Sequence, residues 1–254
     1  MDKVLPLFKS HYSLGRSILN LGKAGSSEEN GPDSIIDIAV ENDLKKVFLV
    51  EDSMSGFLEA YQNLSEKGIK LVFGLRVIMC PDMHEKSEDS RAKSSKYVIL
   101  CKNTQGYKRL IKIASDSSKI GFYYRPRIDF LTLRKYWDDK DLQLCVPFYD
   151  SFIHKNLLTL SVCVPDFDFT KPVFFIEQND LPFDFLIEDK VKEYCDSNKY
   201  NTLLTKSIFY KNKKDFKAYL TFRCINNRSA LSKPQLDHMC SNRFCMEEWK
   251  TINA

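Results

Sequence analysis

Short apolar runs alternate with segments of helical periodicity along this chain. In residues 55–67, for example, Phe57, Tyr61 and Leu64 stand at helical spacing, and Gly68 follows where a helix C-terminal glycine belongs. The apolar runs of strand length are residues 4–8, 46–50, 71–79, 97–101, 142–146, 173–177 and 202–205. Strands that alternate with helices predict a mostly parallel α/β architecture of about seven strands, because parallel strands need crossover connections.

The remaining segments complete this prediction. Pro32 and Asp33 precede an amphipathic helix that is expected to run to about Leu44. Residues 81–96 are polar, charged and without periodicity, so we expect an exposed excursion there. The tail, residues 213–254, is predicted to be mostly helical. No internal repeat or Gly/Ser linker divides the chain, and we therefore expect residues 1–254 to form a single domain.

The composition is that of an ordinary globular protein. The chain has 254 residues, about the size of one α/β barrel, with 43% hydrophobic and 28% charged residues. Its 18 Phe and 12 Tyr predict an aromatic core. The net charge of +4 is compatible with nucleic-acid contact but does not argue for it.

The cysteines and the hydropathy pattern bear on the compartment. The chain has eight Cys, and no pair stands at CxxC spacing. Met1-Asp2-Lys3 opens no signal peptide, and no apolar run reaches membrane-spanning length. We expect free thiols, a cytoplasmic protein and no membrane partner.

Several segments together resemble one known family. They are Ser10 to Leu14, Phe48 to Ser53, Gly68 to Gly74, Asn103 to Leu110, Gly121 to Asp129, and Leu204 to Tyr210. In this order they resemble the PHP (polymerase and histidinol phosphatase) domain at the N-terminus of bacterial DNA polymerase III alpha subunits. The resemblance spans about residues 4–230. It implies a distorted seven-stranded (βα) barrel of PHP type, mostly parallel, with a helical C-terminal tail.

The resemblance also implies where the metal ligands of the family would fall. Those positions hold Leu7 and Lys9, Asp52 and Ser53, Arg76, and Ser207 and Phe209, with a further position near Ser118. Of these, only Asp52 offers a carboxylate. Metal sites of this kind need His and carboxylate ligands, so the resemblance implies that the barrel is kept while its metal site is lost. Lys9 and Arg76 would bring positive charge there and neutralise a remaining carboxylate without metal.

A few residues remain candidates for chemistry or binding. Glu51 and Asp52 stand at a strand end, where they serve either a catalytic site or an ion pair with Lys9 or Arg76. His11 is the one histidine near a family-like segment and is either catalytic or a turn residue. Arg125 and Arg127, beside Tyr123 and Tyr124, either contact phosphates and bases or form a rigid loop.

Three hypotheses about function follow. The first is an inactive PHP-like barrel without a cofactor, which binds a protein partner as a scaffold in a replication complex or in another assembly. The second is a phosphoesterase or exonuclease with a remodelled site, which would use Asp52 and His11 with Mn, Zn or Mg. The third is a metal-free nucleic-acid or nucleotide binder with Lys9, Arg76, Arg125 and Arg127 as anion contacts. The absence of a polymerase body within these 254 residues favours a stand-alone domain, and the Lys- and Asn-rich composition hints at a viral protein in the host cytoplasm.

Overall fold

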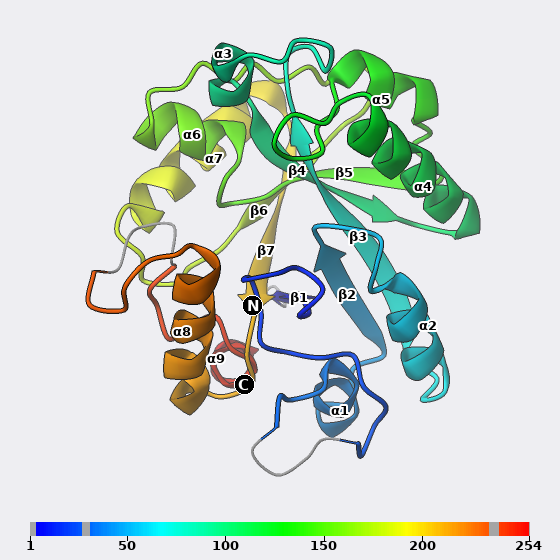
Figure 1. Cartoon of the computed structure of the whole chain (residues 1–254), viewed down its shortest axis with the longest axis vertical. Helices are drawn as coiled ribbons and strands as arrows, with labels where there is room; N and C mark the ends of the chain where they lie inside the picture. Colours follow the sequence, from blue (N-terminus) through cyan, green and yellow to red (C-terminus); the bar gives the residue numbers. More distant parts are fainter. Residues whose placement is uncertain (1–3, 27–30, 234–238, 254) are drawn as a thin grey trace. The chain divides into compact units, whose positions relative to one another are not determined.

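Seven strands form a closed barrel in the order in which they occur along the described part of the chain; their labels are given in Figure 1. The structure is a computed structural model that describes residues 4–26, 31–233 and 239–253. The strands are β1 Leu5–Phe8, β2 Lys46–Glu51, β3 Lys70–Met79, β4 Ser95–Cys101, β5 Leu142–Val146, β6 Val173–Ile176 and β7 Asn201–Ile208. The predicted seven-stranded α/β barrel is therefore confirmed.

Nine α-helices and one 3-10 helix accompany these strands in the described residues. They are α1 Ile35–Glu41, α2 Phe57–Ser65, α3 Glu88–Ala92, α4 Thr104–Lys119, α5 Phe130–Tyr136, α6 Phe152–Leu158, α7 Asp184–Asn198, η1 Lys213–Asp215, α8 Phe216–Asn226 and α9 Met246–Asn253. Side-chain caps set several helix starts. Ser34 caps α1, Asn103 caps α4 and Asp129 caps α5, each by accepting a hydrogen bond from a backbone N–H of the first turn. Gly68 has φ +67° after α2, as its predicted place beyond the helix end requires.

The chain groups into two compact units. The first comprises Met1–Phe73, Glu177–Asp184 and Leu204–Ala254, and the second comprises Gly74–Ile176 and Phe185–Leu203. Strands β3 and β7 contribute residues to both. The prediction of one domain over residues 1–254 stays a prediction, and residues 234–238 of its helical tail lie outside the described residues.

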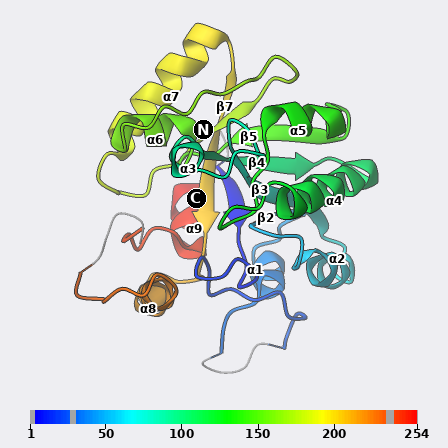
Figure 2. The same cartoon turned by 45° about the horizontal axis from the view of Figure 1, so that its top comes forward.

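In the first unit, β1 is the organising strand. It pairs in parallel with β2 and with β7, so that Leu7 lies in register with both Phe48 and Ser207. Helix α9 packs beside β1 (Figures 1 and 2): Trp249 Nε1 donates to the Val4 carbonyl at 2.8 Å, and the Val4 N–H donates to Asn253 Oδ1 at 3.0 Å. The first strand is thus held by the last helix.

In the second unit, β4 is antiparallel to both β3 and β5, whereas β5 and β6 are parallel. The β3–β4 connection explains the reversal, because it returns without a crossover to the far end. Helices α4 and α5 lie side by side (Figure 2). The core is aromatic, as predicted: Phe152, Phe167 and Phe174 are buried together with ring centroids 6.1 to 6.3 Å apart.

Residues 81–96, predicted to be an exposed excursion, have mostly exposed side chains, but several of them are buried. The segment contains α3, and Met83 and Ser90 are each 1% exposed. Buried Arg127 donates to Ser90 Oγ at 3.1 Å, and Asp129 accepts from the Met83 N–H at 3.1 Å. These partners lie 37 and 46 residues away in the sequence, so the local pattern could not reveal them.

Candidate functional site at the strand ends

An ion pair joins the ends of the first two strands. Lys9 follows β1 directly and Asp52 follows β2, and because these parallel strands are in register their carboxyl ends meet. Lys9 Nζ lies 3.0 Å from Asp52 Oδ1. The Lys9 side chain is 5% exposed and that of Asp52 is 35% exposed. Of the two uses predicted for Asp52, the structure contains the ion pair with Lys9.

Glu51, the last residue of β2, is fully buried beside this pair. The Ser10 N–H donates to Glu51 Oε1 at 2.8 Å, and the Ser13 hydroxyl donates to Oε2. The Ser13 hydroxyl in turn accepts from the Asp52 N–H at 2.9 Å. Burial raises the pKa of Glu51, although Lys9 and the two serines oppose that shift. Both oxygens of this carboxylate are therefore hydrogen-bonded to other groups of the protein.

A second buried carboxylate, Glu177, faces β7. Ser207 donates to it twice, from the hydroxyl to Oε1 at 2.8 Å and from the backbone N–H to Oε2 at 3.1 Å. Burial raises the pKa of Glu177 as well, against the hydrogen bonds from Ser207 and Asn179. Sequence reasoning placed Ser207 at the site but missed Glu177, whose only signal was its position at the end of the apolar run 173–177.

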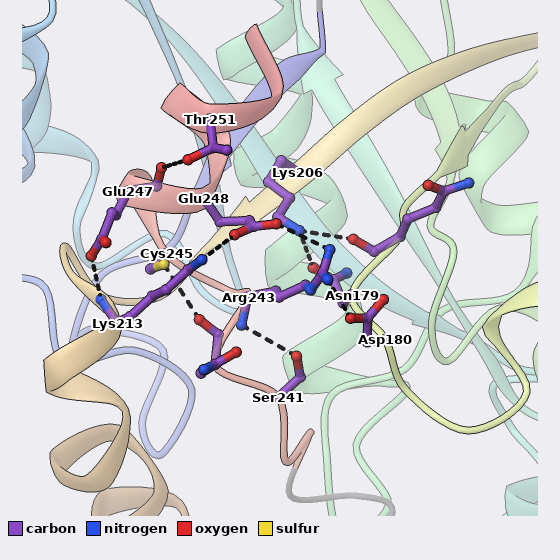
Figure 3. Close-up of polar contacts among 12 residues, drawn as sticks. Asn179, Asp180, Lys206, Lys213, Ser241, Arg243, Cys245, Glu247, Glu248 and Thr251 are labelled. Carbon is purple, nitrogen blue, oxygen red and sulfur yellow. Dashed lines mark hydrogen bonds and ion pairs between the residues drawn. The ribbon is translucent and has the colours of Figure 1, made fainter. Parts of the chain in front are cut away.

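Lys206 is the buried cation near Glu177, and Figure 3 shows its surroundings. The residue is fully buried, and its Nζ donates to Asn179 Oδ1 at 2.6 Å and to the Gln178 carbonyl at 2.8 Å. Burial lowers the pKa of Lys206, and the nearby carboxylates Glu177 and Glu248 oppose this. No local pattern indicates the role of this lysine, because its partners lie 27 and 28 residues away in the sequence.

At the other predicted positions in the first unit, the side chains do not converge as metal ligands. Leu7 is buried in β1, and Ser53 donates to Ser55 Oγ at 3.1 Å. Phe209 is packed between Tyr219 and Phe244, with ring centroids at 5.7 and 5.2 Å. His11 is exposed and its ring lies against Tyr12, which corresponds to the turn role considered for it.

The predicted cations of the second unit have different surroundings. Arg76 lies 3.9 Å from Asp150 Oδ2, an oxygen that also binds Lys96 Nζ at 2.5 Å. Arg125 is exposed. Arg127 is 2% exposed, and its guanidinium donates to the Gly121 and Glu85 carbonyls and to Ser90 Oγ. The prediction of Arg127 as an anion contact is therefore corrected: its donors hold the loop together.

The donor set bears on metal binding. Within residues 4–26, 31–233 and 239–253, no group of three or more His, Cys, Asp or Glu side chains is placed to hold a metal ion. Asp52 and Glu51 face an ammonium and serine hydroxyls, and Glu177 faces Ser207 and Asn179. Among the described residues, the carboxylates at these strand ends therefore face other protein groups and do not form the converging ligand set of a zinc site.

Two further observations concern the chain as a whole. All eight cysteines are free thiols, as predicted. Among the described residues, none of the helices combines the length and apolar character needed to cross a bilayer.

The barrel can now be compared with known proteins. Residues 27–152 of the chain match the PHP domain family. Its relatives include DNA polymerase III subunit alpha of Borreliella burgdorferi, which is 37% identical over 86 residues, and that of Chlamydia pneumoniae, which is 35% identical over 86 residues. Each match covers 33% of this chain and 8% or 7% of the relative. The subunit of Thermus aquaticus is 24% identical over 192 residues, which are 72% of this chain and 16% of that protein. The chain therefore spans only a small part of the length of these relatives.

Proposed function

We propose that this PHP-domain chain is a catalytically inactive binding or scaffold module. The observation that supports this most strongly is the ion pair between Lys9 and Asp52 at 3.0 Å. An ammonium occupies a position where the family resemblance implies a metal ligand, and it neutralises the one ligand carboxylate that remains there. A metal ion at Asp52 would have to displace this ammonium or bind beside its positive charge.

The neighbouring positions support the same proposal. Ser207 donates to Glu177 instead of presenting a ligand, and Phe209 fills its position with a packed ring. Hydrolysis of a phosphodiester by a metal-bound water needs an open coordination site with converging ligands. In this chain those positions are occupied by side chains that bind one another.

Hydrolysis and metal content test the proposal together. The intact chain, purified without chelator, is expected to hold less than about one transition metal ion per molecule by elemental analysis. With added Mn²⁺ or Zn²⁺, we expect no cleavage of single-stranded DNA, nucleotides or a phosphate monoester above background. Residual turnover should be unchanged in Asp52→Ala. Metal-dependent cleavage that both Asp52→Ala and His11→Ala abolish would instead establish the remodelled phosphoesterase.

A binding module needs a partner, and we propose a protein of a replication complex or of another assembly. The relatives that support this are DNA polymerase III alpha subunits. Purification of the chain from its native source, followed by reciprocal purification of each copurifying protein, tests the proposal. A chain that runs as a free monomer in gentle native extracts would contradict it.

A further inference from the structure

The turn formed by residues 120–125 in the second unit has a strained and specific backbone. Gly121 allows its close approach, because a Cβ there would lie 1.8 Å from the Arg127 carbonyl oxygen. Tyr124 has φ +58°, a left-handed conformation that is uncommon for a bulky residue. The Tyr123 N–H donates to the Arg125 carbonyl at 3.1 Å and closes the turn. Such strain persists where the surroundings fix it and is often associated with function.

The surroundings fix this turn from two sides. The buried Arg127 guanidinium donates to the Gly121 and Glu85 carbonyls, and it stacks 5.1 Å from the centroid of the Tyr123 ring. Lys86 Nζ donates to the Ile120 and Phe122 carbonyls, the latter at 2.9 Å. The backbone that carries the aromatic side chains is therefore held in place before any ligand arrives.

The rigid turn presents two aromatic rings to solvent. Phe122 is 53% exposed and Tyr124 is 67% exposed. Tyr123 supports Tyr124 from beside it, with ring centroids 4.7 Å apart and an interplanar angle of 71°. Exposed large aromatics on a fixed backbone offer flat surfaces that lose little conformational entropy when a planar group stacks on them.

Cations flank the exposed rings. The Arg91 guanidinium lies 5.3 Å from the Tyr124 ring centroid and is also paired with Glu88 at 3.1 Å. Arg125, next to Tyr124 in the sequence, is exposed. Arg91 and the Tyr123 hydroxyl share the carboxylate of Glu88. The turn thus combines ring faces with positive charge.

We propose that this turn, residues 120–125, is a binding site for single-stranded nucleic acid. Successive bases stack on Phe122 and Tyr124, while Arg125 and Arg91 contact the intervening phosphates. A single strand offers planar bases next to negatively charged phosphates, which matches exposed rings flanked by guanidinium groups. A duplex keeps its bases stacked inside and cannot offer them to a projecting ring. The site lies in the second unit and does not depend on the proposed lack of catalysis.

Fluorescence anisotropy of a labelled oligo(dT) of about 20 nucleotides tests the proposal on the intact chain, in EDTA so that cleavage cannot interfere. We expect saturable binding that weakens steeply between about 50 and 200 mM salt. Tyr124→Gly should weaken binding by about fivefold or more while its thermal stability is kept or raised, because glycine adopts the positive φ without strain. Tyr124→Phe keeps the ring and should bind within about twofold of the wild type. Arg125→Gln should reduce the slope of log K against log salt by about 0.7.

Matched controls make the result specific. Tyr61→Ala removes a tyrosine of similar exposure, 53%, from α2 in the first unit and should leave binding unchanged. Oligo(U) should bind as oligo(dT) does if stacking dominates, and a preference for either strand would identify its natural source. The proposal is overturned if oligo(dT) does not bind at low salt, if duplex binds equally well, or if Tyr124→Gly binds like the wild type. Self-association that Tyr124→Gly abolishes, in a chain that binds no oligonucleotide, would assign the turn to a protein contact instead.

Discussion

Glu51 is a fully buried carboxyl group, and its contribution to the free energy of unfolding depends on pH. Burial raises its pKa in the folded protein above the value in the unfolded chain. Between those two values the folded state binds more protons, so the free energy of unfolding falls as pH rises through that interval. The stabilisation is complete below the unfolded pKa and is lost above the folded one.

We therefore expect Glu51→Gln to stabilise the protein at pH 7 by about 1 kcal/mol, and to give no gain near pH 4. The amide can still accept from the Ser10 N–H, and Lys9 keeps its pair with Asp52. Urea denaturation at both pH values measures the effect. Glu66→Gln, which alters an exposed pair with Lys23, is the control and should change little at either pH. Equal destabilisation by Glu51→Gln at both pH values would contradict this account.

At the scale of single residues, the sequence predicted only part of the site. The pair between Lys9 and Asp52 was among the predicted alternatives because the family resemblance places both residues at metal-ligand positions of the barrel. Lys206 and Asn179 could not be predicted, since a buried lysine far from its partners leaves no local pattern. The sequence left Arg127 open between an anion contact and a rigid loop, because basic residues beside tyrosines look alike in the sequence whether they are exposed or buried.

At the scale of elements, a network of ion pairs among Asp180, Lys213, Arg243 and Glu248 holds α9 and the segment before it in place (Figure 3). Glu248 has a side chain that is 6% exposed, and it binds Lys213 Nζ at 2.7 Å and Arg243 Nη1 at 3.1 Å. Arg243 Nη2 also binds Asp180 Oδ2 at 2.5 Å. Burial by itself would raise the pKa of Glu248, but Lys213 and Arg243 outweigh it and lower that pKa. This carboxylate consequently stabilises the fold at neutral pH.

Glu248→Gln should lower the free energy of unfolding at pH 7 by about 2 kcal/mol, because it leaves two cations without their shared anion. The contribution is present above the unfolded pKa of Glu248 and is lost as pH falls through its lower, folded value. The difference between variant and wild type should therefore shrink in acid. Guanidinium denaturation against pH measures it. Glu193→Gln, in an exposed pair with Lys190, should cost no more than about 0.5 kcal/mol, and a cost of Glu248→Gln that persists unchanged in acid would argue against the network.

Element boundaries followed the apolar runs closely where a strand is buried on both sides. The predicted strand 142–146 is β5 itself. The helix predicted at 55–67 is shorter, Phe57–Ser65, because its ends fray into turns. Within α4, Leu110 and Ile113 are buried whereas the apolar Ile111 is 43% exposed. The antiparallel direction of β4 could not be predicted, because a pattern of apolar residues indicates where a strand lies in the sequence but not in which direction it runs.

At the scale of the whole molecule, Trp249 should be the strongest single anchor of α9. The residue is 7% exposed and donates from its indole to the Val4 carbonyl beside β1. Trp249→Ala should therefore destabilise the protein by about 3 kcal/mol or more, whereas Trp249→Phe should recover part of this by restoring ring packing. Thermal unfolding followed by far-UV circular dichroism measures both variants. Similar melting temperatures for Trp249→Ala and the wild type would show that α9 is dispensable.

The pairing of β1 with β7 has a consequence for how the chain is made. During synthesis the first strand leaves the ribosome about two hundred residues before its second neighbour, Asn201–Ile208, and before α9. Until then β1 has only β2 beside it and one edge unpaired, which invites wrong pairing with other chains. Folding that waits for such distant contacts is slow. Ribosome-bound chains that end before residue 201 should therefore be protease-sensitive and dependent on chaperones, and they should become resistant only after α9 has emerged.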